Sequence, residues 1–596
     1  MSRAIEPTEG VRLWATRAGL AAVAVIVVQV LWRTVLLGRG YFTQDDFLVM
    51  AGTRQGDWAS VLSGDYAGGF SPGGTAVVWL STNLAPLSWP VAAGTVLVLE
   101  TAATVLMWLV LTRLLGGRWL RLPLLVLFAF APLTLWTTQW WVLGIEYWTA
   151  TTLLLLAVLV LLAALRTGDR RAAVLAVLPV AVALLFDDRA VLYPLVLAGV
   201  AVIAQEGATV RARAASVVRG AAAVWVGLLA VVAGYVVLRW QAAPLELIAG
   251  GEVGDVVTGY LRHSLAEAFG GPWLVTLPAH AYLVPTSWVV ALNGALLLGL
   301  VGATTQRGGP ATRAGWGLLV VFVAASTGVI ALEGGGDLVA SLGLVHRFAA
   351  DLAPVLVLCL AGVLGEVTFP ALRGLGRVLP ADRVEGVLAL VLVVVLSASA
   401  GLSTSRLAGN LHHTDDREYV EAIRAGLRAD PQVVLLDGGV PAGVLSPWYG
   451  DRARVSSVVG YAPENPVFDL PSHDLRIVRE DGTLAPVRLE GAVTSAPSND
   501  AACGYAVRSD GTEVPMAAQV PDGRWVVRIG YYTNADGYAT VAIAGTTQRF
   551  AVRSGLHAVQ LVVEGAFDRF RATLGEAGTT LCLTDAAAGV PRAETP

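Results

Sequence analysis

The sequence contains no lysine, so all 41 of its basic side chains are arginines. Charged residues of every kind make up only 14% of its 596 residues, whereas roughly 25% is usual in a soluble globular domain. Hydrophobic residues reach 55%. This shortage of charge excludes a soluble globular protein and predicts a polytopic α-helical membrane protein.

The short motifs of common metal, dithiol and nucleotide sites are absent as well. The three cysteines form no Cys-x-x-Cys pair, and there is neither a His-Glu-x-x-His sequence nor a Walker phosphate-binding loop. The formal net charge is −4 and no stretch forms a basic patch. The sequence therefore indicates no site of these kinds and no nucleic acid partner.

Long apolar runs recur through the first two thirds of the sequence. Runs of about 20 apolar residues predict helices that span a membrane. The first run follows Arg12 and Arg17 and lacks a small-residue cleavage site, so we interpret it as a retained signal anchor. About eleven such runs occur, near residues 18–37, 88–112, 122–141, 147–165, 172–186, 190–205, 220–238, 286–304, 315–332, 348–364 and 386–402.

Arginine is concentrated in alternate loops between these runs. Residues 113–121, 166–171 and 211–219 each contain three arginines, and most of the intervening loops contain fewer. Loops rich in arginine face the cytoplasm. The pattern therefore predicts a cytoplasmic N-terminus, and eleven spans would place the C-terminal tail outside the cytoplasm.

The composition changes after residue 402, and this change predicts the domain organisation. Residues 1–402 form a transmembrane domain with a long first external loop at 38–87. Residues 403–490 are expected to form an extracytoplasmic α/β linker region, because a helical pattern is followed by short apolar runs. Short strands between Gly, Asp and Asn turns then predict a β-sandwich over 491–596.

Two of the cysteines, Cys503 and Cys582, lie in this predicted sandwich. A disulfide is permitted outside the cytoplasm. Two cysteines can pair in only one way, but their spacing does not show whether they lie within reach. Cys359 lies inside an apolar run and is expected to be a small apolar side chain.

Two adjacent carboxylates, Asp45 and Asp46, open the first external loop. Charges at a membrane surface are costly unless they are solvated, paired or used. One carboxylate could act as a general base on a hydroxyl, and we favour Asp46 with Asp45 as its partner. The same pair could ligate a divalent cation, although the sequence establishes no cofactor. The alternative is structural, because Thr43 followed by Asp46 resembles a capping box.

A second acidic cluster, Asp187, Asp188 and Arg189, falls in a turn between two short apolar runs. Such a turn could be a self-contained surface tip. It could instead line a cavity beside Asp45 and Asp46, because short spans allow the connecting turn to sink inward. Glu146, beside another external turn, could add a carboxylate to the same cavity.

A basic pair, His346 and Arg347, begins one of the later runs. An arginine in this position could hold a phosphate through two parallel hydrogen bonds. It could also pair with Asp351 one turn later and only anchor the helix end. Both interpretations stay open.

Aromatic residues and one isolated acid complete the candidates. Trp58, Tyr66 and Trp140 could stack on a sugar ring, or could belong to the interfacial belt that membrane proteins commonly carry. Glu100 lies within the second apolar run, where an ionisable group is a functional hypothesis by default. A hydrogen-bonded structural role inside the bundle is the alternative, which we favour.

The order of these features resembles the GT-C superfamily of polytopic glycosyltransferases. The resemblance covers about residues 18–402 and rests on Asp45-Asp46, Asp187-Asp188 and His346-Arg347. Other branches have Asp-Glu or Asp-x-Asp where this chain has Asp-Asp. A membrane core followed by a β-sandwich is similar to the arabinofuranosyltransferases of actinobacterial cell walls, in which the sandwich often binds carbohydrate. The arginine-only composition is typical of a high-GC bacterial genome.

The resemblance implies an enzyme of the bacterial cytoplasmic membrane that functions in cell wall biogenesis. It would transfer a sugar, with inversion, from a polyprenyl-phosphate donor to a cell-envelope glycan or lipid acceptor. Asp46 or Asp45 would be the base, and Arg347, His346 and Arg189 would bind the donor phosphate. The lipid tail would require an apolar groove between spans.

Three other classes of protein stay open. A lipid-linked glycan polymerase or ligase would share the chemistry at the outer face, and the sequence does not exclude it. A transporter or flippase would show internal repeats and broken helices, and the sequence shows no clear repeat. A non-catalytic assembly protein of the cell envelope would tolerate replacement of Asp45, Asp46 and Arg347.

Overall fold

The computed structural model describes residues 16–55, 70–242, 253–271, 275–276, 284–332, 346–367, 381–498, 500, 502–574 and 580–594. Internal contacts divide the chain into two compact units. The membrane unit comprises Met1–Phe42 with Gln55–His413, and the tail unit comprises Thr43–Arg54 with Thr414–Pro596. The structure confirms a helical membrane protein with a β-rich C-terminal domain, while its division of the chain differs from the predicted one.

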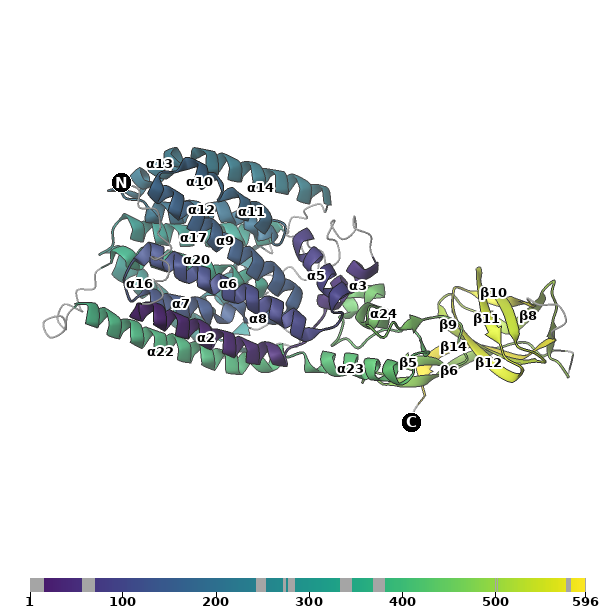
Figure 1. Cartoon of the computed structure of the whole chain (residues 1–596). Coiled ribbons are helices and arrows are strands. Elements are labelled where there is room, and N and C mark those ends of the chain that lie inside the picture. Colours follow the sequence, from purple (N-terminus) through teal and green to yellow (C-terminus); the bar gives the residue numbers. More distant parts are fainter. Residues whose placement is uncertain are drawn as a thin grey trace. The chain divides into compact units, whose positions relative to one another are not determined.

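The membrane unit contains, in its described part, nine helices that are long and apolar enough to cross a membrane (Figure 1). They are α2 (Arg17–Arg39), α6 (Trp89–Leu115), α7 (Arg121–Ala129) continued by α8 (Leu135–Gln139), α9 (Trp141–Thr167), α14 (Ala222–Ala242), α16 (Ser287–Thr305), α17 (Pro310–Leu332), α19 (His346–Ala350) continued by α20 (Leu352–Glu366), and α22 (Ala381–Leu407).

The predicted count of about eleven spans is not confirmed. The runs at 172–186 and 190–205 fold as the shorter helices α11 (Val177–Ala183) and α12 (Tyr193–Ala204). Because a helix rises 1.5 Å per residue, the 12 residues of α12 extend only about 18 Å, well short of a bilayer core of roughly 30 Å. The turn that joins these two helices can therefore lie below the end of the bundle.

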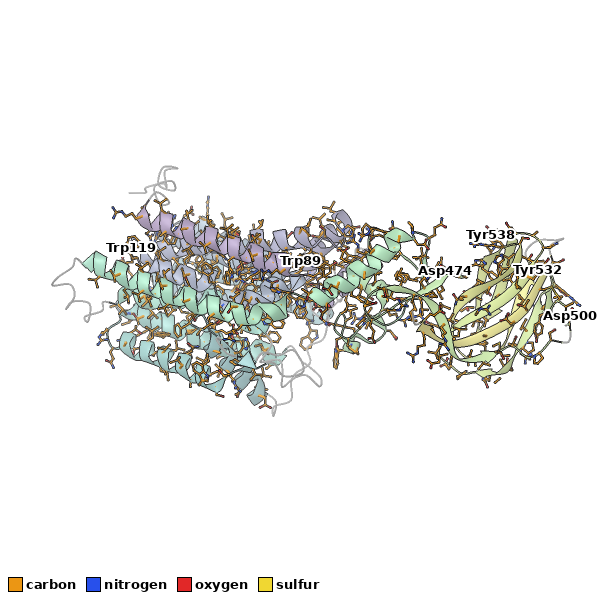
Figure 2. The ribbon with its side chains drawn as sticks, turned by 90° about the horizontal axis from the view of Figure 1, so that it is seen from below. Trp89, Trp119, Asp474, Asp500, Tyr532 and Tyr538 are labelled. Carbon is orange, nitrogen blue, oxygen red and sulfur yellow. A yellow bond between two sulfur atoms is a disulfide. The ribbon has the colours of Figure 1, made fainter. Side chains whose placement is uncertain are left out.

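Burial separates central helices from peripheral ones. The apolar windows of α7 with α8 and of α19 with α20 are each 89% buried. Those of α14 and α16 are each 17% buried, so most of their apolar side chains face outward, as lipid contact requires. Trp89, at the start of α6, and Trp119, just after its end, lie at opposite ends of the bundle (Figure 2).

An ion pair buried in the membrane unit joins α2 to α6. Arg33 Nε lies 2.8 Å from Glu100 Oε1, and neither side chain is exposed by more than 1%. Gln29 Nε2 donates to the same carboxylate oxygen at 3.1 Å. Arg33 Nη2 donates to Thr134 Oγ1 at 2.9 Å. Buried charges need such partners, so these contacts support the structural alternative for Glu100.

The tail unit combines a small α/β part with a β-sandwich. One sheet has the order β11 (Thr546–Val552), β10 (Gly537–Ile543), β13 (Phe567–Leu574) and β8 (Thr512–Val520). The other has the order β12 (Gly555–Glu564), β9 (Arg524–Thr533), β14 (Leu581–Ala593), β6 (Leu484–Thr494), β5 (Leu475–Val478), β3 (Val434–Leu435) and β4 (Val467–Phe468), with β7 (Tyr505–Val507) beside β14.

The longer sheet extends across residue 490, where the sequence predicted a boundary. Strands β3, β4 and β5 come from the predicted linker region, yet β5 pairs with β6 and continues the sheet of the sandwich. Strand β3 is parallel to both β4 and β5. Helix α23 (Thr414–Ala429) has a strongly apolar face, with Tyr419, Ile423 and Leu427 buried. The described residues of this region therefore belong to one compact unit.

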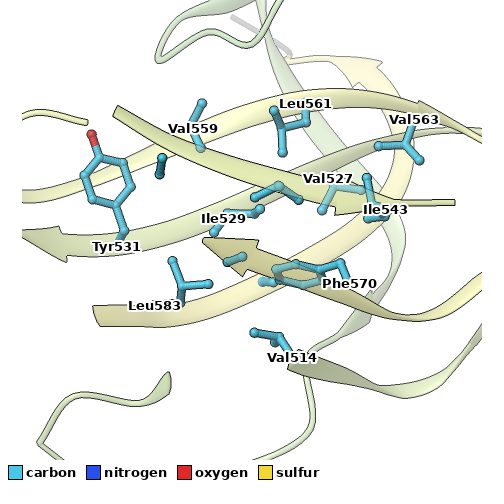
Figure 3. Packing of buried hydrophobic residues seen from close by; sticks show 14 of the residues in the cluster. Val514, Val527, Ile529, Tyr531, Ile543, Val559, Leu561, Val563, Phe570 and Leu583 are labelled. Atoms are coloured by element: carbon cyan, nitrogen blue, oxygen red, sulfur yellow. The ribbon is translucent and has the colours of Figure 1, made fainter. Parts of the chain in front are cut away.

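The core of the sandwich follows the alternation of its strands. In β9 the inward side chains are Val527, Ile529 and Tyr531, two residues apart, as strand geometry requires (Figure 3). Phe570 of β13 and Val514 of β8 face them from the other sheet. The structure joins Cys503 and Cys582 in a disulfide, with their Cα atoms 5.1 Å apart.

Candidate active site

A cavity lies in the membrane unit where the start of α9, the start of α5 (Pro72–Leu84) and the turn between α11 and α12 meet. It belongs to the Trp89 end of the bundle, which is the end predicted to face out of the cytoplasm. Its volume of about 70 Å³ is room for a few water molecules or a small anion. The lining residues are Phe70, Ser71, Thr137, Leu143, Glu146, Tyr147, Phe186, Asp187, Asp188 and Arg189.

This cavity brings together four residues that the sequence singled out. Glu146 lies on α9, and Asp187, Asp188 and Arg189 form the turn into the 3₁₀-helix η2 (Asp188–Leu192). Asp187 Oδ1 accepts a hydrogen bond from the backbone N–H of Arg189 at 3.0 Å and so caps this turn. The acidic turn therefore forms part of the cavity wall, while the functional role predicted for these carboxylates stays a prediction.

The segment 71–73, at the start of α5, is held against the acidic turn. Ser71 Oγ donates to the carbonyl of Phe186 at 3.1 Å, and the N–H of Gly73 donates to the carbonyl of Leu185 at 2.7 Å. A Cβ at Gly73 would lie 2.8 Å from Phe186 Cε2 and 2.9 Å from the Leu185 oxygen. Only glycine allows this approach, so the segment sets one wall of the cavity.

Arg189 reaches across to the start of α20. Its Nη1 lies 2.7 Å from Asp351 Oδ2, and the two side chains are 9% and 10% exposed. Its guanidinium carbon also lies 4.2 Å from the centroid of the Phe348 ring. Tyr147 Oη donates to the carbonyl of Ala350 at 3.0 Å. These contacts tie α9, η2 and α19 together around the arginine.

The charges around Arg189 affect the neighbouring carboxyl. Burial, and then the negative charge of Asp351, raise the pKa of Asp187 well above its usual range. The guanidinium of Arg189 acts in the opposite direction. The carboxylate of Asp188 accepts no hydrogen bond from the described residues. The cavity thus contains one carboxyl with a raised pKa, one without a described hydrogen-bond donor, and one fixed cation.

The paired acids Asp45 and Asp46 begin α3 (Asp45–Gln55), which belongs by its contacts to the tail unit. Asp46 is fully buried, and its Oδ2 accepts a hydrogen bond from the Thr43 N–H at 3.1 Å. That bond is one of the two reciprocal bonds of a capping box. The Gln44 side chain donates to Gly443 O at 3.2 Å and accepts from Ser446 N at 3.0 Å. Asp45 is half-buried.

The structure describes the remaining predicted site residues only in part. His346 and Arg347 are the first two residues of α19, and their side chains lie outside the described part of the chain. Trp58 and Tyr66 lie outside the described residues altogether. Trp140 precedes α9 and does not line the cavity. Among the described residues, no group of three or more His, Cys, Asp or Glu side chains is placed to hold a metal ion.

Sequence reasoning did not identify Ser71, Tyr147 or Asp351 as parts of this cavity or of its support. The adjacent glycines Gly73 and Gly74 were the available signal, because neighbouring glycines often mark a close backbone approach. The Arg189–Asp351 pair joins residues 162 positions apart, and nothing in the local sequence indicates it.

Several solved structures are similar to this chain, whereas no family model and no curated protein matches it. The arabinofuranosyltransferase AftD from Mycobacteria has 13% identity over 96% of this chain and 60% of its own, with a TM-score of 0.34. ArnT from Cupriavidus metallidurans bound to undecaprenyl phosphate has 13% identity over 80% of this chain and 94% of its own, with a TM-score of 0.40. The arabinosyltransferase EmbB from Mycobacterium smegmatis has 14% identity over 100% of this chain and 65% of its own, with a TM-score of 0.29.

The chain spans less than two thirds of the length of the AftD and EmbB structures. At these identities no residue's role is carried over from the similar structures to this chain.

Proposed function

We propose that this protein is a membrane glycosyltransferase that moves a sugar from a polyprenyl-phosphate donor to a cell-envelope glycan or lipid acceptor. The observation that supports this most is the cavity in which Arg189 lies beside Asp187 and Asp188. Such a transfer needs a fixed cation for the phosphate that leaves and a carboxylate for the proton of the acceptor hydroxyl. The cavity contains both kinds of group.

We propose that Arg189 is the main ligand of the donor phosphate. Asp351 and the Phe348 ring hold the guanidinium at the cavity wall. A positioned guanidinium is suited to phosphate, because its planar fork of N–H donors matches two phosphate oxygens. Arg347 and His346, less than two turns before Asp351, remain proposed as further phosphate ligands.

On the acceptor side we propose a carboxylate base from one of two acidic pairs. Asp46 or Asp45 is the base that the GT-C resemblance implies, and Asp188 is the candidate within the cavity. The base removes the proton of the acceptor hydroxyl while that oxygen attacks the anomeric carbon. The bond between this carbon and the phosphate oxygen breaks, its electron pair leaves with polyprenyl phosphate, and the sugar configuration inverts.

A separate apolar cavity supports a lipid-linked donor. It has a volume of about 370 Å³ and lies among α7, α16, α20 and α22. All its lining side chains are apolar, and Leu388, Leu392 and Leu396 line it from three successive turns of α22. A space without polar groups suits an isoprenoid chain, whose burial is favourable at about 0.8 kcal/mol per methylene.

The test is release of polyprenyl phosphate from a panel of polyprenyl-phosphate sugars by the purified full chain in lipid nanodiscs. We expect release by the natural protein and a loss of at least about 100-fold in the variant that removes the base. To identify the base, the release rate is compared among three variants, Asp46→Asn, Asp45→Asn and Asp188→Asn. Glu206→Gln removes an exposed acid and serves as the control, with unchanged release expected.

Absence of release with every donor, from protein shown to be folded, would contradict the proposal. Movement of an intact lipid-linked sugar across the bilayer without release would establish the transporter alternative instead.

A further inference from the structure

Within the tail unit, residues 469–474 connect β4 to β5 and lie against the sandwich. In the middle of this connecting segment, the Ser472 N–H donates to the Gln560 carbonyl at 3.0 Å, and the Gln560 N–H donates to the Ser472 carbonyl at 2.8 Å. Gln560 belongs to β12, which is the last strand at one end of its sheet. The connecting segment therefore holds the α/β part on the sandwich by pairing with an edge strand.

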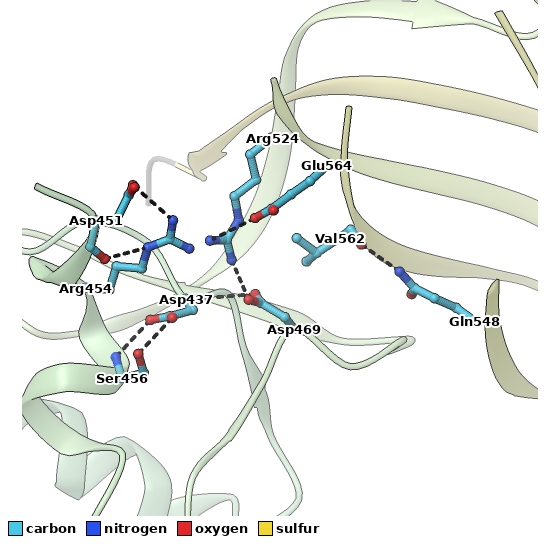
Figure 4. Close-up of polar contacts among 9 residues, drawn as sticks. All are labelled: Asp437, Asp451, Arg454, Ser456, Asp469, Arg524, Gln548, Val562 and Glu564. Atoms are coloured by element: carbon cyan, nitrogen blue, oxygen red, sulfur yellow. Dashed lines mark hydrogen bonds and ion pairs between the residues drawn. The ribbon is translucent and has the colours of Figure 1, made fainter. Parts of the chain in front are cut away.

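An acidic residue fixes the first end of the connecting segment (Figure 4). Asp469 Oδ1 accepts a hydrogen bond from the N–H of Asp437 at 2.9 Å, and Asp469 Oδ2 pairs with Arg524 of β9. Arg524 also lies 3.8 Å from Glu564 of β12. The carboxylate of Asp437 in turn accepts from Ser456 N and from Ser456 Oγ, each at 2.8 Å. This end is therefore bonded both to the α/β part and to the sandwich.

A histidine fixes the other end. His473 Nε2 lies 2.7 Å from the hydroxyl of Tyr531 in β9, and this tyrosine is fully buried in the sandwich core. The same hydroxyl accepts a hydrogen bond from the Arg553 N–H at 2.9 Å. The one proton of the phenol is therefore available for His473 Nε2. Only a neutral imidazole with its own proton on Nδ1 can accept that proton.

Positive groups lie around His473. The ring of His557, in β12, has its centroid 6.3 Å from that of His473, and Arg553 lies just before the same strand. Burial, and then the positive charges of Arg553 and His557, lower the pKa of His473. The folded tail unit therefore favours the neutral imidazole.

The carboxylates nearest to this histidine are engaged with other groups. Asp474 Oδ1 lies 2.7 Å from Arg476 Nε, and Asp536 Oδ1 accepts a hydrogen bond from the Ser554 N–H at 2.7 Å. Among the residues that the structure describes, no carboxylate forms an ion pair with His473. A proton on His473 would therefore put a positive charge at a half-buried position without a counter-ion.

We propose that residues 469–474 are a pH-sensitive connection, which holds the α/β part on the sandwich while His473 is neutral and detaches when His473 takes up a proton. As a cation, the ring carries an N–H on both nitrogens and can only donate to Tyr531, so the phenol loses the acceptor of its proton. The pairing of Ser472 with β12 weakens together with this bond. All these contacts lie inside the tail unit, so the proposal stands whether or not the protein transfers sugar.

The direction of the pH effect follows from the two protonation equilibria. Because the pKa of His473 is lowered in the folded state, the unfolded state binds the proton more readily. The stabilisation is present above the usual histidine pKa of 6.5 and is lost as the pH falls below it. Asp469 acts in the opposite direction, because burial raises its pKa and protonation then favours the folded state. Release at acidic pH is therefore assigned to His473.

The test is amide hydrogen exchange of the full chain in lipid nanodiscs, measured by mass spectrometry between about pH 7.5 and about pH 5. We expect the amides of residues 470–475 to exchange at least about fivefold faster at the acidic end, beyond the intrinsic change with pH. The strands β10 and β11 pair with each other and not with the connecting segment. Their exchange in the same samples, corrected in the same way, is expected to stay unchanged.

Two substitutions separate His473 from the other titratable groups. His473→Gln stays neutral and its amide oxygen can accept the Tyr531 proton, so we expect protection over the whole pH range. Tyr531→Phe keeps the ring in the core but removes the hydroxyl, so we expect fast exchange of residues 470–475 already at neutral pH. The matched control is Glu513→Gln, which changes an exposed carboxylate of β8 and is expected to keep the acceleration.

Thermal unfolding at neutral pH identifies any variant that fails to fold, and if His473→Gln fails, Tyr531→Phe still decides. Three results would each overturn the proposal. The first is natural protein in which residues 470–475 show no acceleration at acidic pH. The second is the same acceleration in His473→Gln as in the natural protein. The third is an equal acceleration in β10 and β11, which would indicate unfolding of the whole sandwich.

Discussion

Arg189 contacts a carboxylate and an aromatic ring at once, and this double contact distinguishes it from a surface arginine. Its Nη1 is 2.7 Å from Asp351, and its guanidinium carbon is 4.2 Å from the Phe348 centroid. A guanidinium held in this way cannot be replaced by an ammonium group, because lysine has neither the planar fork nor the flat face. The contacts of this single residue therefore determine how the proposed site would bind the donor phosphate.

We expect Arg189→Lys to lower kcat/KM for the polyprenyl-phosphate sugar by roughly 100-fold, because the positive charge remains but the two-bond geometry is lost. The measurement is the rate of polyprenyl phosphate release at varied donor concentration. Arg213→Lys is the matched control, since Arg213 pairs with Glu366 at 2.7 Å and is similarly buried, but lies away from the cavity. A similar loss in both variants would show that the effect is only structural.

At the scale of elements, short helices and turns position the chemistry while long helices supply the frame. The acidic turn lies between α11 and α12, which are too short to cross a bilayer, and the segment 71–73 at the start of α5 packs on it. In the tail unit, α3 is joined to α23 through Thr43 and Asp416. Burial raises the pKa of Asp416 to about 7. A hydrogen bond from the Thr43 side chain lowers this pKa, and the negative charge of Asp415 raises it.

This pKa makes the tail unit sensitive to pH. The native pKa of Asp416 lies above the usual value of 3.8, so the folded state binds the proton more tightly than the unfolded state does. The stabilisation is complete below about pH 4 and is lost as the pH rises through about 7. We expect amide exchange in α3 and α23 to accelerate between pH 5.5 and 8, about tenfold beyond the intrinsic change.

Asp416→Asn is expected to remove this pH dependence, because the amide has no charge to bury. Glu480→Gln, which changes an exposed carboxylate between β5 and β6, is expected to keep it. A pH dependence that persists in Asp416→Asn would assign the titration to another group.

At the scale of the whole molecule, the chain consists of two units with different means of stabilisation. The membrane unit buries an Arg33–Glu100 pair inside an apolar bundle. The tail unit has a sandwich core and a disulfide that closes a segment of 79 residues. A cross-link of this length restricts the unfolded tail more than a short one would.

We expect the double variant Cys503→Ser with Cys582→Ser to lose about 2–4 kcal/mol of stability in the tail unit. The measurement is denaturant unfolding of the full chain, followed by the exposure of Tyr531, which is buried in the sandwich core. Cys359→Ser serves as the comparison, because Cys359 is a buried thiol in α20 that forms no disulfide. Its replacement is expected to change the stability of the membrane unit and not that of the tail unit. Reducing agent should reproduce the effect of the double variant and leave the double variant itself unchanged.

The sequence by itself determined the membrane-spanning helices and the β-rich tail. Both are local patterns: a spanning helix needs a run of apolar residues, and a strand alternates inward and outward side chains. It also indicated which carboxylates and arginines lie at the ends of helices, including the Asp187-Asp188-Arg189 turn. These features depend on residues that are close together in the sequence.

Only the tertiary structure decided which of those residues meet. Arg189 pairs with Asp351, Glu100 pairs with Arg33, and α3 joins the tail unit although it follows the first span. Each contact joins segments far apart in the chain, and its formation depends on how helices and sheets pack. A one-dimensional pattern shows which side chains must be buried or paired, but the partner is chosen by packing.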